Sequence, residues 1–165
     1  MFHVRFGGPL LAALLIMLAA PAFAQAKGQT CRAGQAELKP LQPLVLVTDK
    51  GRFAFQVENA DTPKRREIGL MCRTALAPNR GMLFDFGKPT DSVAFWMDNT
   101  LIPLDIIFIR PDGRVLSIAR NARPLDDSLL PAGGQIRGVL EIAGGRAAQL
   151  GLMPGDRVLH RIFPR

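Results

Sequence analysis

Histidine, cysteine and tyrosine are scarce in this chain, whose 165 residues include two His, two Cys and no Tyr. Because only His160 lies outside the first two dozen residues, a zinc site built from His and Cys would lack ligands. The chain has no G-x-S-x-G motif, no P-loop and no H-E-x-x-H motif, and its serines have no triad partner in view. We therefore predict no metal site and no cofactor, and the motifs identify no catalytic residue.

Basic residues outnumber acidic ones, with 21 Lys and Arg against 14 Asp and Glu and a formal net charge of +7. They are scattered along the chain and are not interleaved with aromatic residues, which argues against a nucleic-acid-binding surface. The positive charge favours an acidic partner or an anionic surface of the cell envelope. An arginine-rich composition of the source organism explains the same charge.

The N-terminus has the three parts of a secretory signal peptide. Arg5 supplies a basic start, residues 10–20 form an apolar run, and Ala22-Phe23-Ala24 supplies the small residues of a cleavage site. The run is shorter than the roughly 20 apolar residues that span a membrane, so we expect no stable span after cleavage; an uncleaved anchor is the alternative. Cleavage after Ala24 predicts a periplasmic or secreted protein.

Removal of residues 1–24 leaves 141 residues, enough for one domain with a buried core and too few for two ordinary domains. Arg5 leaves with the signal peptide, so the formal net charge falls to +6. Residues 25–43 are polar and contain Gly and Pro, which predicts an extended segment. Residues 44–165 are then expected to form a single compact, mainly β domain.

Cys31 and Cys72 both remain after cleavage, and an exported protein meets an oxidising environment. Two cysteines allow one intramolecular pairing, which would join the N-terminal segment to the end of a predicted helix. Closing a loop of about 40 residues stabilises a protein by roughly 4 kcal/mol in the chain-entropy model. We predict a disulfide between Cys31 and Cys72; two unrelated, partly buried thiols are the alternative.

Apolar runs and alternation, separated by turn residues, predict about eight short strands and two short helices. The strands are expected at residues 44–47, 53–57, 82–86, 93–97, 104–109, 115–119, 136–142 and 157–162. One helix is expected from Pro63 to about Met71 and another from Gly145 to Leu150, with a long loop at 121–134. The predicted fold class is α+β, predominantly antiparallel β, in a small barrel-like domain.

The segment Phe95–Asp105 carries the most distinctive side chains, including the only Trp. Asp105 shares a face with two isoleucines of an apolar strand, where a carboxylate needs a cation or several N–H donors. In one interpretation Arg73 forms a structural ion pair with Asp105, and the neighbouring polar residues hold a turn. In the other, a small polar pocket binds a ligand through Arg73, Trp96, Asn99, Thr100 and Asp105.

Glu141 is a second acidic residue in an apolar strand, between Leu140 and Ile142. If it approached Asp105, the two carboxyl groups could share the roles of acid and base. Nothing in the sequence brings the two residues together. We therefore interpret Glu141 as a strand residue that faces solvent.

These residues also carry a resemblance to a known family. The matching segments are Ile68–Arg73, Gly81–Phe84, Phe95–Asp105, Asp112–Val115 and Gly151–Asp156. In this order and spacing they resemble a widespread bacterial and archaeal family of small, often exported proteins classed as a domain of unknown function. The resemblance covers roughly residues 44–162 and implies a compact, mainly β domain with a short helix and no established activity. The family signature falls on Gly69, Leu70, Met71, Arg73, Gly81, Met82, Trp96, Met97, Asn99, Thr100, Pro103, Leu104 and Asp105.

Two residues lie where that family is variable. These residues are Cys72 and Asp98, and a basic residue often replaces Asp98 in that family. Such variability argues against a catalytic role for either residue. Our leading hypothesis is an exported, non-enzymatic domain that binds a small ligand or an envelope partner through Trp96, Asn99 and Asp105. The alternatives are a carboxylate-dependent hydrolase or lyase that uses Asp105 with Arg73, and a structural or adaptor protein of the cell envelope.

Overall fold

The computed structural model describes residue 31 and residues 37–164. The predicted signal peptide and most of the predicted extended segment lie outside these residues. Within them the chain forms nine strands and two short helices. In chain order these are β1 (Gln42–Thr48), β2 (Gly51–Ala60), α1 (Pro63–Ile68), β3 (Arg80–Thr90), β4 (Ala94–Phe95), β5 (Leu104–Ile109), β6 (Val115–Ala122), β7 (Leu130–Pro131), β8 (Ile136–Ala143), α2 (Arg146–Leu150) and β9 (Arg157–Leu159).

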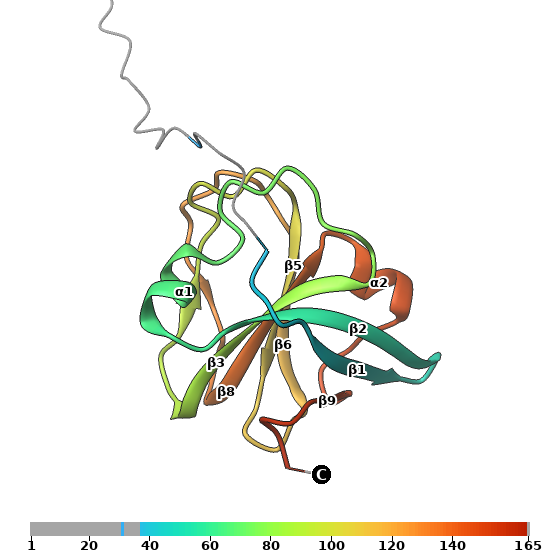
Figure 1. The fold of residues 1–165 in the computed structure, drawn as a ribbon. Coiled ribbons are helices and arrows are strands. Elements are labelled where there is room, and N and C mark those ends of the chain that lie inside the picture. Colours follow the sequence, from blue (N-terminus) through green and yellow to red (C-terminus); the bar gives the residue numbers. More distant parts are fainter. Residues whose placement is uncertain (1–30, 32–36, 165) are drawn as a thin grey trace, which may run out of the picture.

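Seven of these strands form one sheet in the order β6-β5-β8-β3-β2-β1-β9, and β4 pairs with β7 separately. Neighbours run antiparallel except β2 and β3, which are parallel. A bridge between Arg114 and Arg157, with a hydrogen bond from the Val158 N–H to the Gly113 oxygen (2.8 Å), links the two ends of the sheet. The sheet therefore curls into a barrel-like shape (Figure 1), and the predicted fold class is confirmed.

Local sequence explains where α1 begins and ends. Thr62 caps the helix by accepting a hydrogen bond from the Arg65 N–H (3.2 Å). Pro63 occupies the first turn, so the helix begins at the predicted residue. The helix ends at Ile68, three residues before the predicted end. Gly69 has a φ of +50°, a conformation that favours glycine, and its N–H donates to the Arg65 oxygen.

The second half of the chain differs from the prediction in its short strands. The expected strand 93–97 is reduced to the two residues of β4, and the expected loop 121–134 contains β7. Phe95 of β4 lies opposite Leu130 of β7. A two-residue strand has too few residues for alternation to reveal it, so local pattern misses β7.

Apolar side chains fill both faces of the sheet. One cluster lies on the concave side and includes Leu44, Val57 and Ile107, with Ala147 and Leu150 of α2. The other lies on the opposite face, under α1 and the loops that precede β3 and β5. Burial of a large apolar side chain contributes roughly 1.5–3 kcal/mol. Because both faces are covered, all six residues of β5 are buried.

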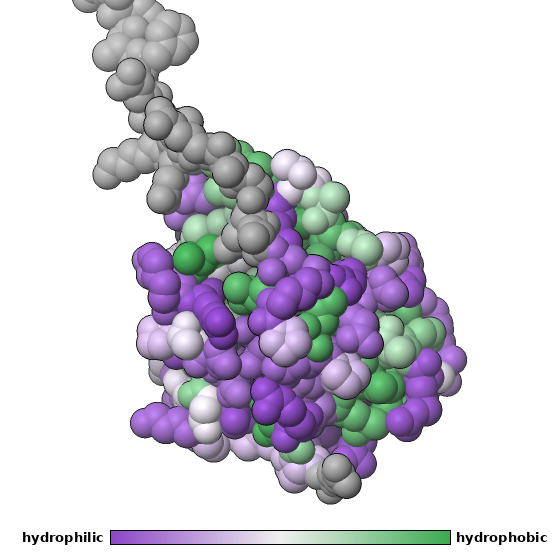
Figure 2. All heavy atoms as spheres, in the orientation of Figure 1, coloured by the Kyte–Doolittle hydropathy of each residue, from purple (hydrophilic) through white to green (hydrophobic). Residues whose placement is uncertain are grey.

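Polar residues cover most of the face that Figure 2 shows, and they break the apolar area into separate patches. The exposed large apolar side chains include Trp96, Leu101, Leu125 and Leu129. A hydrogen bond from the Leu125 N–H to the Thr100 oxygen (3.2 Å) joins the loops that carry them. In the described part of the chain, no helix is long and apolar enough to cross a membrane.

Candidate functional site

Asp105 is fully buried and is bound by backbone groups. Its Oδ1 accepts hydrogen bonds from the N–H groups of Asn121 (2.7 Å) and Gly145 (3.1 Å), and its Oδ2 accepts one from Ala147 (2.6 Å). These donors lie near the end of β6 and at the start of α2. The carboxylate thus ties β5 to both elements, and N–H donors satisfy it in the way that a buried charge requires.

Arg73 forms an ion pair with Glu58 of β2. The Arg73 Nη2 lies 2.8 Å from the Glu58 Oε2, and the two side chains are 14% and 3% exposed. The same carboxylate oxygen accepts a hydrogen bond from the Leu38 N–H (2.6 Å). The pair that the sequence suggested between Arg73 and Asp105 does not form, because three backbone donors bind Asp105 and Glu58 binds Arg73.

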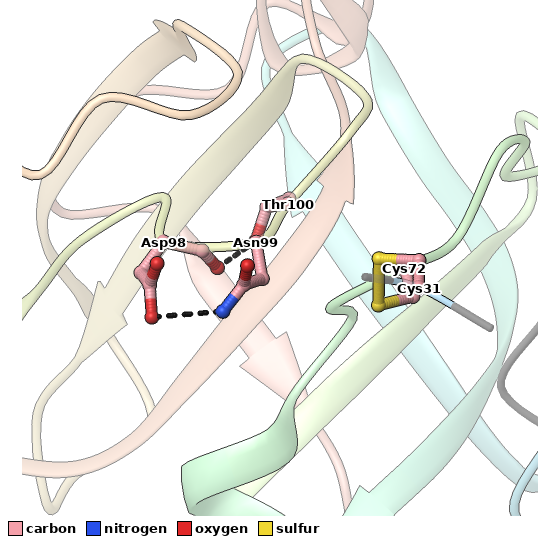
Figure 3. The surroundings of a disulfide bond; sticks show 5 residues. All are labelled: Cys31, Cys72, Asp98, Asn99 and Thr100. Atoms are coloured by element: carbon pink, nitrogen blue, oxygen red, sulfur yellow. Dashed lines mark hydrogen bonds between the residues drawn. A yellow bond between two sulfur atoms is a disulfide. The ribbon is translucent and has the colours of Figure 1, made fainter. Parts of the chain in front are cut away.

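A disulfide joins Cys31 to Cys72, which confirms the predicted pairing. The Cys72 N–H donates to the backbone oxygen of Asn99 (2.8 Å), so the cysteine also holds the loop before β5. In that loop Asn99 has a φ of +52° and its Nδ2 donates to Asp98, while the Thr100 hydroxyl donates to the Asp98 backbone oxygen (Figure 3). Asn99 and Thr100 therefore hold the turn, as the structural interpretation expected.

A cavity of about 410 Å³ lies beside this loop. Its wall comes from α1 and the residues after it, from β3, from the segment around β4 and from β8. The lining is mostly apolar and includes four aromatic side chains, Phe84, Phe86, Phe95 and Trp96. This volume and this lining are typical of small-molecule sites, which measure about 300–1,000 Å³.

Glu141 of β8 supplies a buried carboxyl group to the wall of this cavity. The residue is 5% exposed, and among the described residues its Oε2 has no hydrogen-bond partner. It lies opposite Met82 of β3 and Ile106 of β5, so its strand neighbours are apolar. Burial raises the pKa of the Glu141 carboxyl to about 8, because an apolar environment disfavours the charged form. The expectation that Glu141 faces solvent is therefore wrong.

Charged side chains also contribute to the cavity wall. The Arg66 Nη1 donates to the Asp85 backbone oxygen (2.8 Å), and its guanidinium group lies over the Phe86 ring at 5.2 Å. Glu67 is exposed and pairs with Lys64 at 3.3 Å. In the described part of the chain, Arg66 and Glu67 thus bind groups other than Glu141.

The structure brings only part of the predicted site together. Trp96, which is half exposed, and Thr100 both line the cavity, whereas Arg73, Asn99 and Asp105 do not. The residue that sequence reasoning left out of the site is Glu141. The sequence feature that could have identified Glu141 is a single acidic residue within an apolar strand. When both faces of such a strand are covered, its acid is buried.

The remaining described acids and histidine do not assemble a metal site. Among residue 31 and residues 37–164, no three His, Cys, Asp or Glu side chains gather closely enough to hold a metal ion. The chemistry that the arrangement offers is thus an apolar cavity, a carboxyl group with hydrogen-bonding capacity to spare, and aromatic rings that can pack against a ligand.

Comparison with protein families identifies a matching family. The model of the DUF192 family, described as an uncharacterised ACR, matches residues 45–160. No curated protein matches the chain. The resemblance predicted from the sequence is therefore confirmed over most of the β domain.

Two solved structures are similar to the chain. A protein from Sinorhizobium meliloti 1021, provisionally named a transcription regulator, is 37% identical with a TM-score of 0.73, and the match covers 79% of this chain and 100% of that one. A protein of unknown function from Novosphingobium aromaticivorans DSM 12444 is 44% identical with a TM-score of 0.71, covering 78% of this chain and 95% of that one. Both similarities extend over nearly all of the related chains.

Proposed function

The chain belongs to the uncharacterised DUF192 family, and from that premise we propose that it is an exported, non-enzymatic domain that binds a small molecule in the cavity beside Glu141. One observation carries the proposal. Glu141 lines an apolar cavity of about 410 Å³, and its buried Oε2 has no hydrogen-bond partner among the described residues. A buried polar group left unsatisfied costs roughly 1–3 kcal/mol, and a ligand with a matching polar group would offset that cost.

The composition of the wall supports binding without catalysis. Among the described residues, the cavity lining includes no Ser, Cys, His or Lys. Its Thr100 hydroxyl donates to the Asp98 backbone oxygen, not to a base that would activate it as a nucleophile. The alternative enzyme, a hydrolase or lyase that uses Asp105 with Arg73, has less support. Asp105 accepts three backbone hydrogen bonds, and Arg73 is paired with Glu58.

Export is part of the same proposal. The signal-like N-terminus supports it, and so does the Cys31–Cys72 disulfide, because disulfides persist mainly in oxidising compartments. An envelope protein or an anionic surface stays an alternative partner, with the net positive charge as its motivation.

Ligand-induced thermal stabilisation tests the proposal. The exported, disulfide-bonded protein is screened against neutral, cationic and anionic small molecules, and the fluorescence of Trp96, the only Trp, reports binding at the cavity wall. Ala94→Trp places a large side chain in the cavity wall, whereas Ala75→Trp adds the same side chain at an exposed position away from it.

We expect one chemical class to raise the melting temperature of the wild type and of Ala75→Trp, and not that of Ala94→Trp. The melting transition of each variant shows whether it folds. A wild type that no compound stabilises, or an Ala94→Trp variant that responds as the wild type does, would overturn the proposal and leave the structural or adaptor role.

A further inference from the structure

Resting on the proposed function, we infer that the ligand is an uncharged, ring-bearing molecule with a hydrogen-bond acceptor, to which the Glu141 carboxyl group donates its proton in a hydrogen bond. The inference names the chemical class of the ligand from three properties of the cavity. These are its aromatic walls, the burial of the Glu141 carboxyl group, which raises its pKa, and the lack of a hydrogen-bond partner for the Glu141 Oε2 among the described residues.

Aromatic rings form the walls and hold one another in place. The Phe84 and Phe95 rings meet edge to face, with centroids 5.0 Å apart and an interplanar angle of 82°. Phe95 makes a similar contact with Phe108 at 5.9 Å and 87°. Rings fixed in this way present flat faces and polar edges that favour an aromatic or alicyclic ligand over a flexible chain.

The surroundings of Glu141 keep its carboxyl group neutral at pH 7. Met82 and Ile106 flank it on the neighbouring strands. In the same row of the sheet, Glu58 lies beyond Met82 and is itself paired with Arg73. Arg80 of β3, two residues from Met82, pairs with Glu37. The flanking strands thus give Glu141 no ion pair among the described residues, which agrees with a pKa raised to about 8 by burial.

The charged groups from the other elements around the cavity have partners of their own. Arg66 and Glu67 come from α1: the first binds the Asp85 oxygen and packs on Phe86, and the second pairs with Lys64. Asp98, from the loop before β5, accepts a hydrogen bond from Asn99 (3.0 Å).

A neutral carboxyl group selects its ligand by hydrogen bonding. Its O–H group donates to a carbonyl oxygen or ring nitrogen and is left unsatisfied by a ligand without an acceptor. A cationic ligand would be stabilised in this apolar site only after Glu141 lost its proton. An anionic ligand would bring a second acidic group into an apolar wall. The uncharged acceptor is therefore the class that the site accommodates at neutral pH.

Three naphthalene probes with the same ring and a two-carbon substituent test the inference by calorimetry. They are 1-acetylnaphthalene, which has a neutral acceptor, 1-ethylnaphthalene, which has none, and 1-(1-aminoethyl)naphthalene, which is a cation. At pH 6 we expect the ketone to bind about tenfold more tightly than either of the others. At pH 9.5, where Glu141 is ionised, we expect the ketone to lose that advantage.

Variants of Glu141 separate its role from that of the walls. Glu141→Gln keeps a neutral N–H donor, so it should preserve the preference for the ketone and make it independent of pH. Glu141→Leu removes the donor and should abolish the preference. Asp49→Asn removes an exposed carboxylate in the β1–β2 turn, away from the cavity, and should behave as the wild type.

The outcomes distinguish this inference from the proposed function. Tightest binding of the amine, or a ketone preference that survives in Glu141→Leu, overturns the inference and leaves the cavity as a binding site. If none of the three probes binds but another chemical class stabilises the wild type, the inference of an uncharged, ring-bearing ligand is overturned. Failure of every compound in the wider screen overturns the proposed function itself.

Discussion

Asp105 and Glu141 lie on neighbouring antiparallel strands with their carboxyl groups on opposite faces of the sheet. Asp105 is opposite Ile142, and Glu141 is opposite Ile106, so the two acids are offset by one residue in register. Because side chains alternate between faces, that offset separates them. The two carboxyl groups therefore cannot share the roles of acid and base, and each has its own environment: backbone donors for Asp105 and an apolar cavity for Glu141.

Glu141→Gln is predicted to remove a pH dependence of stability. The pKa of Glu141 is about 8 in the folded protein and 4.5 without burial, so between these values the folded state holds a proton that the unfolded state has lost. The free energy of unfolding should therefore fall as pH rises from 4.5 to 8, by a few kcal/mol, and stay level below that range. Urea unfolding at a series of pH values measures this decline.

The matched control for this prediction is Glu67→Gln, at an exposed carboxylate that pairs with Lys64. It should retain the decline of the wild type, whereas Glu141→Gln should flatten it and be the more stable protein at pH 8. Parallel curves for Glu141→Gln and the wild type would show that Glu141 ionises normally in the folded state.

Asp105→Asn is predicted to destabilise the domain without weakening ligand binding. In the wild type, two carboxylate oxygens accept hydrogen bonds from three backbone N–H groups. In Asp105→Asn one of these oxygens becomes an NH₂ group, which cannot accept a hydrogen bond and lies against a backbone N–H. We expect a loss of about 3 kcal/mol in urea unfolding. Asp112→Asn, at an exposed turn, should change stability by less than about 0.5 kcal/mol. A stable Asp105→Asn protein that has lost ligand binding would contradict this prediction and show that Asp105 contributes to the binding site.

Local sequence determined much of the fold. The expected strand at 53–57 lies within β2 and supplies Phe55 and Val57 to the core, and the expected strands at 104–109 and 115–119 pair as β5 and β6. The parallel pairing of β2 with β3 was not predicted, because alternation says which face of a strand is apolar and nothing about which strand lies beside it. Register and neighbour depend on contacts between residues far apart in the chain.

The same limit explains the candidate site. Trp96 and Thr100 were selected because they lie in one distinctive segment, and both line the cavity. Glu141 was interpreted as facing solvent, on the assumption that the polar face of a strand is wet. Here α1 and the loops cover that face, so an alternating acid becomes a buried one. Coverage of this kind is a tertiary property, and the isolated acid in an apolar strand indicates it only indirectly.

Arg73 and Glu58 are predicted to show energetic coupling. Arg73→Gln removes the cation that pairs with the buried Glu58 carboxylate and leaves it the hydrogen bond from the Leu38 N–H, so we expect a loss of about 3 kcal/mol. Glu58→Gln in the Arg73→Gln background should cost less than it does in the wild type, with a coupling energy of about 1–3 kcal/mol. Additive losses in urea unfolding would contradict the importance of this ion pair.

Replacing both cysteines by serine is predicted to lower the free energy of unfolding by about 4 kcal/mol, because the disulfide closes a loop with a sequence separation of 41 residues. Binding should also weaken, since the disulfide anchors the Cys72 backbone, whose N–H holds Asn99 in the loop that supplies Trp96 and Thr100 to the cavity. Thermal melts with and without reductant measure the first effect. A wild type whose melting temperature ignores reductant would contradict it.

Gly81→Ala is predicted to destabilise the domain and to displace Glu141. Gly81 of β3 lies opposite Ile142, and a Cβ added there would be 2.5 Å from the Glu141 backbone oxygen and 3.1 Å from the Ile142 Cγ2. Because a backbone atom cannot rotate away, β8 must shift, and we expect a loss of about 2–3 kcal/mol. Gly134→Ala is the matched control, since its added Cβ would meet only ordinary contacts, 3.4 Å away at the nearest.

Unfolding in urea compares the two glycine variants, and the pH dependence of the unfolding free energy then tests the link to the site. A shift of β8 admits water to the Glu141 carboxyl, which lowers its pKa, so the decline in stability between pH 4.5 and 8 should shrink in Gly81→Ala and persist in Gly134→Ala. Equal stabilities for the two variants would show that β3 and β8 have room at Gly81. An unchanged decline in Gly81→Ala would show that Glu141 stays dry when its own backbone moves.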